Sequence, residues 1–173
     1  MQAAGSDAED GAVTPSEPRS RPPSQDRTPR PTPADVGCWL LKTARPLEEV
    51  ADGWAPGTTA SAWRCVRPSY RLGLMRPGER CVLWRSGAAE PGVHALGTVE
   101  QAPRQRDDGE PHVLLRLHRL PAPVPRRELM ADGVLAGAEV LRMPAGSNPS
   151  YLRPEHLEAL LHLLHPDDVA AVW

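Results

Sequence analysis

The chain has 173 residues, with 20 Lys and Arg against 22 Asp and Glu, and 40% of its residues are hydrophobic. This composition is typical of a soluble globular protein. The formal net charge of -2 excludes a polybasic protein that holds long nucleic acid by charge alone. There is no run of about 18 apolar residues, and the polar, acidic start does not resemble a secretory signal. We therefore expect a cytoplasmic protein with no membrane partner.

The first 36 residues are rich in Pro, Ser and charged side chains, as in the stretch TPSEPRSRPPS at 14–24. Such a segment has too few apolar side chains to offset its ordering entropy by burial. We predict a disordered tail over 1–36, followed by one folded domain over 37–173.

The apolar pattern predicts four strands. Order begins abruptly at an apolar run around Trp39, which is typical of a buried first strand. Short loops join the middle strands, which favours antiparallel pairing, whereas the Gly-, Thr- and Ala-rich segment before Trp63 is expected to be a loop. The predicted strands cover residues 37–43, 80–86, 92–99 and 112–118.

Short helices are predicted over 46–50, 70–75, 126–132 and 154–165. Ser69 is placed to cap the second of these. The last begins at Pro154, stops at Pro166 and carries four leucines at helical spacing on one face, Leu157, Leu160, Leu161 and Leu164. Together these elements predict an α+β fold, a small mixed β-barrel with flanking short helices.

No motif for catalysis is present: the chain has no G-x-S-x-G sequence, no Walker loop and no Rossmann glycine pattern. The histidines at 156, 162 and 165 have no obvious carboxylate partner, and His112 and His118 are widely separated. The three cysteines form no C-x-x-C pair and indicate neither a disulfide framework nor a zinc site. We expect a protein that is not an enzyme and that needs no metal or cofactor.

Three tryptophans occupy positions that can converge on one mouth of a small barrel: Trp39, Trp63 and Trp84. An indole ring stacks on a nucleobase with about 1–3 kcal/mol per base. Burial of each ring in a core that lacks Phe is the alternative interpretation.

Arginines gather around two of these tryptophans. The window from 61 to 86 holds six arginines and one acid, Glu79, which gives it a net charge of +5. A guanidinium group binds two phosphate oxygens at once through two parallel hydrogen bonds. This window is therefore suited to a phosphate beside a stacked base. A solvated charged surface is the alternative.

In chain order, these segments resemble the EVE domain of the PUA-like superfamily, which is related to the YTH and ASCH domains. The resemblance covers about 37–165. The matching stretches are WLLKT at 39–43, WRCVR at 63–67, YRLGLM at 70–75, PGE at 77–79, VLWRS at 82–86, PGVHALGTV at 91–99, NPS at 148–150 and PEHL at 154–157.

The resemblance implies binding without turnover. A modified nucleobase of DNA or RNA, such as 5-methylcytosine or 5-hydroxymethylcytosine, would leave its stack and enter an aromatic pocket with a basic rim. The residues expected to contact the base are Trp39, Trp63, Trp84, Ser86, Asn148 and Ser150. The residues expected to contact phosphate are Arg64, Arg67, Arg71 and Arg85.

The chain departs from the family pattern at two places. It has Cys65-Val66-Arg67-Pro68 after the first pocket tryptophan, and His112-Val113 where many relatives carry a second tryptophan wall. That wall is missing, or His112 or Trp84 supplies it. A protein-interaction domain that kept the fold without the pocket and an accessory domain in nucleic-acid modification or restriction stay open as alternatives. The modified base, the choice between DNA and RNA, and the oligomeric state also stay open.

Overall fold

The computed structural model describes residues 30–87 and 89–173. Residues 31–173 form one compact unit, and the following description concerns that unit. The predicted disordered tail falls, up to position 29, outside the described residues.

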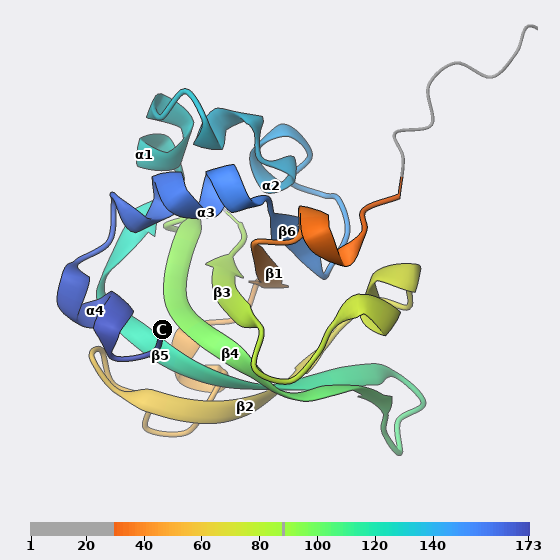
Figure 1. Cartoon of the computed structure of the whole chain (residues 1–173). Helices are drawn as coiled ribbons and strands as arrows, with labels where there is room; N and C mark the ends of the chain where they lie inside the picture. Colours follow the sequence, from red (N-terminus) through yellow and green to blue (C-terminus); the bar gives the residue numbers. More distant parts are fainter. Residues whose placement is uncertain (1–29, 88) are drawn as a thin grey trace, which may run out of the picture. The chain divides into compact units, whose positions relative to one another are not determined.

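The unit is built on one six-stranded mixed sheet with the strand order β2-β5-β4-β3-β1-β6 (Figure 1). Strands β1 and β3 run parallel, and all other neighbours pair antiparallel. The long strand β4 bends strongly along its length, and its pairing with β5 shifts register at three places. The strands are β1 (Cys38–Thr43), β2 (Thr59–Cys65), β3 (Arg80–Arg85), β4 (Gly92–Gln105), β5 (Pro111–Pro125) and β6 (Ser150–Leu152).

The helices are short, and α1, α2 and α3 lie together over one side of the sheet (Figure 1). Ser69 caps η3 as predicted, because its hydroxyl accepts a hydrogen bond from the Arg71 backbone (3.3 Å). No helix in the described part of the chain is long and apolar enough to cross a membrane. The helices are η1 (Pro33–Asp35), η2 (Leu47–Glu49), η3 (Tyr70–Leu74), α1 (Arg126–Ala131), η4 (Leu135–Gly137), α2 (Glu139–Arg142), α3 (Pro154–Leu161) and α4 (Pro166–Ala170).

The sheet buries apolar side chains on both of its faces. On β1, Cys38 and Leu40 join a cluster that includes the leucines of α1, η4 and α3, which we call the helix-side core. Trp39 and Leu41 join a second cluster on the other face, the inner core. Successive side chains of a strand point to opposite faces, so each apolar run along β1 and β3 supplies both cores.

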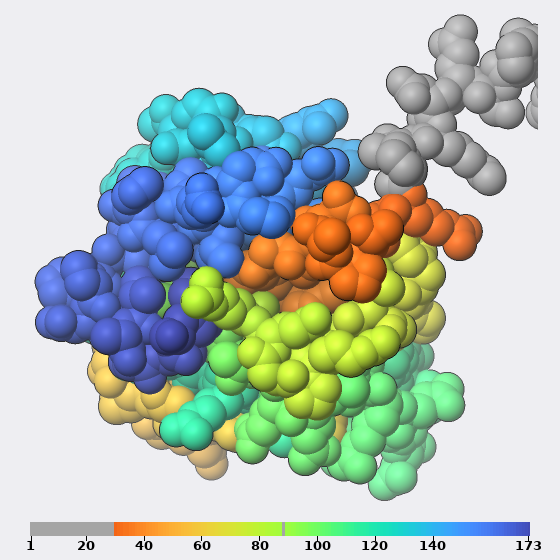
Figure 2. All heavy atoms as spheres, in the orientation of Figure 1, coloured from red at the N-terminus to blue at the C-terminus, as the bar shows by residue number. Residues whose placement is uncertain are grey.

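The first and last segments of this unit, around η1 and after α4, lie against other elements of the fold. On the face shown in Figure 2, the orange segment around η1 lies between the blue helices and the yellow-green segment that contains η3. The C-terminal Trp173 donates its indole N–H to the Gly97 carbonyl on β4 (2.8 Å). Its ring also stacks under the Arg80 guanidinium, 5.4 Å from the ring centroid. These contacts hold α4 against the sheet.

The α+β class and the four predicted strands are confirmed. The expected loop before Trp63 is wrong, because residues 59–65 form β2. The predicted strands at 92–99 and 112–118 are too short, since β4 and β5 continue to 105 and 125. Strand β6 and helix α4 were not expected, and α3 ends at 161, before the predicted 165.

Candidate functional site

The parallel strands β1 and β3 end side by side, and several predicted site residues lie near the C-terminal ends of these two strands. Thr43 pairs with Arg85 at the end of the ladder, and the Ser86 backbone N–H donates to the Thr43 carbonyl (2.7 Å). The loop 143–149 lies next to these strand ends, because Lys42 Nζ donates to two of its carbonyl groups, at 3.0 and 3.2 Å. Burial lowers the pKa of Lys42, Glu139 opposes that effect, and two nearby arginines add to it.

A cavity of about 280 Å³ opens near the C-terminal end of β3, and we call it the Trp84 cavity. Two residues predicted from the sequence to contact a base, Trp84 and Ser86, line it together. Its volume is just below the roughly 300–1,000 Å³ of small-molecule sites, so it has room for one small group. Its lining is Trp84, Ser86, Gly87, Pro91, Arg126 and Pro144.

Asn148 and Ser150 lie beside β1, but their polar groups have protein partners. Asn148 Oδ1 accepts from the Lys42 backbone N–H (2.9 Å), and its Nδ2 donates to the Lys42 carbonyl (3.5 Å). The Ser150 hydroxyl is fully buried and donates to Glu139 Oε2 (3.0 Å). Neither residue lines the Trp84 cavity.

Arg71 forms an ion pair with Glu139 in place of a free guanidinium. Its Nη1 lies 2.9 Å from Glu139 Oε2, the side chains are 11% and 17% exposed, and the same nitrogen donates to the Pro149 carbonyl (3.2 Å). The guanidinium also stacks on the Tyr151 ring, 5.2 Å from its centroid. Burial alone would lower the pKa of Arg71, but hydrogen bonds with Glu139 and Tyr70 outweigh it and raise the pKa. The pair ties η3 to α2.

Arg64 reaches from β2 to the end of β1. Its Nη2 donates to the Thr43 hydroxyl (3.0 Å). Its Nε is the one buried side-chain polar atom that has no hydrogen-bond partner among the described residues. Burial lowers the pKa of Arg64, and the charge of Arg45 lowers it further. Arg64 thus holds β2 to β1 with a charge that no carboxylate of the described chain pairs.

The two remaining predicted phosphate contacts, Arg67 and Arg85, differ in exposure. Arg67 is exposed, and its backbone N–H donates to the Asn148 carbonyl (2.7 Å). Arg85 is partly buried and lies 3.6 Å from the exposed carboxylate of Glu90. Of the four predicted phosphate contacts, Arg67 is the most exposed.

The expectation that Trp39, Trp63 and Trp84 converge on one mouth is wrong. Trp39 is 1% exposed in the inner core, where its indole N–H donates to Glu79 Oε2 (2.7 Å). Trp84 is 4% exposed in the helix-side core. Adjacent strands of one sheet place alternate residues on opposite faces, and Trp39 and Trp84 fall on different faces.

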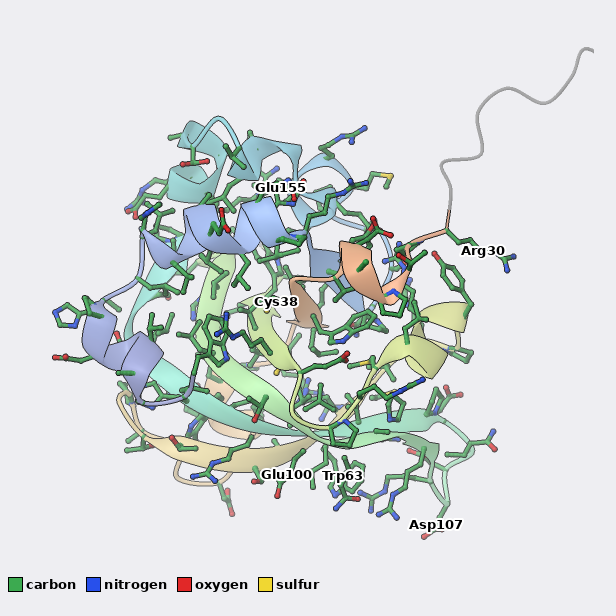
Figure 3. The ribbon with its side chains drawn as sticks, in the orientation of Figure 1. Arg30, Cys38, Trp63, Glu100, Asp107 and Glu155 are labelled. Carbon is green, nitrogen blue, oxygen red and sulfur yellow. The ribbon has the colours of Figure 1, made fainter. Side chains whose placement is uncertain are left out.

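Trp63 is half-buried on β2 and belongs to neither core (Figure 3). Two guanidinium groups lie over its ring, those of Arg104 and Arg106, at 4.7 and 4.9 Å from the centroid. His112, considered above as a second pocket wall, contacts its own hairpin: its Nδ1 lies 3.1 Å from the Glu110 carbonyl oxygen and its Nε2 lies 3.5 Å from Asp108. Neither Trp63 nor His112 lines the Trp84 cavity.

Four of the residues that line the cavity were not expected from the sequence: Gly87, Pro91, Arg126 and Pro144. Gly87 and Pro91 lie between β3 and β4, whereas Arg126 and Pro144 come from segments far from β3 in the chain and belong to no recognisable motif. The charge of Arg126, at the start of α1, is the one signal that pointed to a polar role.

A second polar group missed by the sequence analysis joins Thr59, His118 and Asp168. The two ring nitrogens of the buried His118 lie 3.3 Å from the Thr59 hydroxyl and 3.3 Å from Asp168 Oδ1. The three residues come from β2, β5 and α4, so no sequence spacing relates them. The group connects α4 to the sheet. No three His, Cys, Asp or Glu residues of the described ranges gather closely enough to hold a metal ion.

No protein-family model matches the chain, and no curated protein is similar enough to match. Solved structures share its fold. A Rhodopseudomonas palustris protein is 17% identical, with 76% of this chain and 97% of that chain covered and a TM-score of 0.58. A Pseudomonas putida protein is 14% identical, with 73% and 98% covered and a TM-score of 0.55.

Human THYN1, solved in complex with DNA that contains 5-methylcytosine, is 18% identical, with 75% of this chain and 99% of that chain covered and a TM-score of 0.50. At these identities the likeness concerns the fold. The fold expected from the resemblance is thereby confirmed.

Proposed function

We propose that this domain binds nucleic acid that carries a modified base and holds that base in the Trp84 cavity without chemical turnover. The observation that carries the proposal is the cavity itself, where the predicted pair Trp84 and Ser86 lies together with Arg126. The shared fold with human THYN1, solved with 5-methylcytosine DNA, supports this choice of ligand.

The chemistry of the lining suits one flipped base. Trp84 offers an aromatic surface, the Ser86 hydroxyl donates or accepts a hydrogen bond, and Arg126 supplies a positive charge. Extracting a base from its stack costs a few kcal/mol, so contacts to the flanking phosphates must offset that cost. The exposed Arg67 and the guanidinium of Arg126 are the residues we assign to these contacts.

The modification itself contributes less than the phosphates. A buried methyl group adds about 0.8 kcal/mol, which corresponds to a few-fold preference for 5-methylcytosine over cytosine. A hydroxymethyl group adds a hydrogen-bonding group that Ser86 can satisfy. In this proposal Trp39, Asn148 and Ser150 position the surrounding elements without touching the base, since their polar groups already have protein partners.

The test is a titration with short single- and double-stranded oligonucleotides, unmodified or carrying 5-methylcytosine, 5-hydroxymethylcytosine or N6-methyladenine. Binding is read by fluorescence anisotropy, with tryptophan fluorescence as a second signal. We expect tighter binding of one modified strand, and we expect Ser86→Ala to reduce that preference. Arg126→Ala is expected to weaken binding of every strand.

Arg127 offers a matched control for Arg126. It is the next residue of α1 and lines an adjoining groove, but it does not line the Trp84 cavity. Arg127→Ala removes the same charge and should leave the affinity within about 2-fold, because in this proposal Arg127 contacts neither the base nor a flanking phosphate. Equal losses in the two variants would argue against the cavity as the site.

A protein-binding domain is the second candidate, and the burial of Trp84, which is 4% exposed, favours it. The adjoining groove of about 450 Å³ contains three prolines, Pro91, Pro123 and Pro125, and would offer such a partner a larger surface. The same titration separates the two candidates. Failure of every strand to bind at low salt would contradict nucleic-acid binding and favour a protein partner.

A further inference from the structure

Trp63 and the two arginines above it form a surface feature separate from the Trp84 cavity. We call this group, Trp63, Arg104 and Arg106, the Trp63 clamp. The indole comes from β2, whereas Arg104 lies near the end of β4 and Arg106 follows it in the β4–β5 hairpin. Both arginines are exposed, and their guanidinium carbons lie 4.7 and 4.9 Å from the ring centroid. None of the three residues lines the cavity.

Within residues 30–87 and 89–173, neither guanidinium of the clamp has a carboxylate at ion-pair distance. Two nearby acids are engaged elsewhere. Glu100 accepts a hydrogen bond from the Ser61 hydroxyl (2.6 Å), and Asp108 accepts from the Glu110 backbone N–H (3.0 Å). Asp107 lies at the tip of the hairpin, away from the labelled Trp63 (Figure 3). The positive charge of the clamp is therefore not neutralised locally by an ion pair.

Two like charges held on one ring repel each other, and an anion between them relieves that repulsion. Stacking on the indole also fixes the planes of the guanidinium groups, so less conformational entropy is lost when their N–H groups bind an oxyanion. Bidentate contact with phosphate is the geometry that guanidinium groups favour. The clamp has the features of a preorganised phosphate site.

We propose that the Trp63 clamp binds the phosphodiester backbone of a nucleic acid strand, at a second site apart from the base cavity. This inference rests on the proposed function. A nucleic acid offers phosphate anions to the two guanidinium groups and planar bases on which these groups also stack, whereas an acidic peptide offers the anion alone. The exposed, aromatic and cationic character of the clamp thus favours a nucleic acid strand.

The test compares Arg104→Ala, Arg106→Ala and the double variant with the wild-type protein, using one modified and one unmodified oligonucleotide. Affinities are measured between about 50 and 200 mM salt. Each single variant should bind both strands about 3- to 10-fold more weakly and reduce the slope of log K against log salt by about 0.7–0.9. The double variant should reduce the slope by roughly twice as much, and the ratio between the two strands should stay unchanged.

Arg80 supplies the matched control, because it also stacks on a tryptophan, 5.4 Å from the Trp173 ring centroid. Arg80→Ala removes one charge and one arginine–indole stack outside the clamp. Circular dichroism and thermal unfolding check that each variant stays folded, as expected for exposed arginines. We expect the salt slope of Arg80→Ala to stay close to that of the wild type.

Four results would overturn the inference. If the wild-type protein binds a modified strand and the double clamp variant has the same salt slope, the clamp is not a phosphate site while the proposed function stands. If Arg80→Ala lowers the slope as much as the clamp variants, the effect is net charge alone. If the wild-type protein binds no strand at low salt, or if polyglutamate competes as well as the oligonucleotide, the nucleic-acid assignment of the clamp fails.

Discussion

The side chain of Asn148 pairs with the backbone of Lys42 as a strand residue would. Its Oδ1 accepts from the Lys42 N–H (2.9 Å), and its Nδ2 donates to the Lys42 carbonyl (3.5 Å). The backbone ladder between β1 and β6 ends at Leu40 and Ser150, so the carboxamide extends the pairing by one more step. A residue expected to contact a base instead fixes the loop that borders the Trp84 cavity.

Replacing Asn148 by Ala should destabilise the fold by about 1–2 kcal/mol, because the partly buried Lys42 N–H and carbonyl lose their partners. Urea unfolding measures this loss. Asn148→Asp keeps the acceptor for the Lys42 N–H and should lose less stability than Asn148→Ala. Faster hydrogen exchange at Lys42 in the Ala variant alone would support the assignment, and unchanged exchange in both variants would contradict it.

Arg71 and Glu139 should be energetically coupled. Removing one partner of a largely buried pair leaves the other charge uncompensated, at a cost of about 3–5 kcal/mol for a fully buried pair. Both side chains keep some exposure, so we expect Arg71→Ala to cost roughly 2–3 kcal/mol. A double-mutant cycle with Glu139→Ala should show a coupling above about 1 kcal/mol. Additive losses in the two single variants would show that the pair contributes only through packing.

The tryptophans should differ sharply in their effect on stability. Trp39→Ala removes an inner-core side chain and should cost about 3–5 kcal/mol, enough to unfold a marginal domain. Trp63→Ala removes a half-buried surface ring with two arginine stacks and should cost about 1–2 kcal/mol. Thermal unfolding of both variants, with Trp39→Phe as the conservative comparison, measures the difference. Equal losses at the two sites would contradict the burial described above.

Thiol reactivity gives a direct check of the sheet faces. Cys38 and Cys81 are buried in the helix-side and inner cores, and Cys65 is exposed. Burial raises the pKa of both core thiols, and a thiol reacts as its thiolate. We expect a chromogenic disulfide reagent to label one thiol quickly in the native protein and all three in denaturant. Rapid labelling persisting in Cys65→Ser would contradict this placement.

His156 should make stability fall as the pH drops below neutrality. Burial lowers the pKa of His156 from its usual 6.5, and its neutral Nδ1 accepts the Arg153 N–H at the start of α3 (3.4 Å). The unfolded chain takes up its proton near pH 6.5, before the folded protein does. The stability contributed by neutral His156 is therefore complete above that pH and is lost as the pH falls through the folded pKa.

Denaturant titrations at several pH values between about 7 and 5 test this dependence. His156→Gln, whose amide oxygen still accepts the Arg153 N–H, should weaken the dependence without abolishing it, because burial lowers the pKa of His94 too. His162, exposed just after α3, is the control. A larger effect from His162→Gln than from His156→Gln would point away from the capping contact.

The strands that the sequence predicted correctly are those whose apolar runs fill both cores, such as β1 and β3. Strand β2 was missed because only Ala62 of its seven residues is buried, which leaves no apolar run to recognise. The end of β5 was missed because of its three prolines. That segment pairs only with β4, since the ladder with β2 ends at His118, and proline is tolerated on an unpaired strand side.

The candidate site was also predicted only in part, because the sequence indicates only those contacts that follow from local spacing. Trp84 and Ser86 lie close in the chain and line one cavity, as the strand pattern indicated. The prediction that Trp39 and Trp84 converge was wrong, because a resemblance in residue order does not determine on which face of the sheet each side chain lies. Arg71 and Asn148 found partners in α2 and β1, 68 and 106 residues away. Sequence patterns of local spacing carry no information on such contacts.

The position of β6 beside β1 has a consequence for biosynthesis. Leu40 of β1 pairs with Ser150 of β6, which is synthesised more than one hundred residues later. Strand β1 therefore cannot pair with β6 until that segment has been made. During vectorial translation, at about 5–20 residues per second, the outer edge of β1 stays open until almost the whole domain has left the ribosome. An unpaired apolar edge of this kind recruits other chains. Nascent or prematurely terminated products that lack residues 148–152 should therefore be the species that chaperones and proteases meet first.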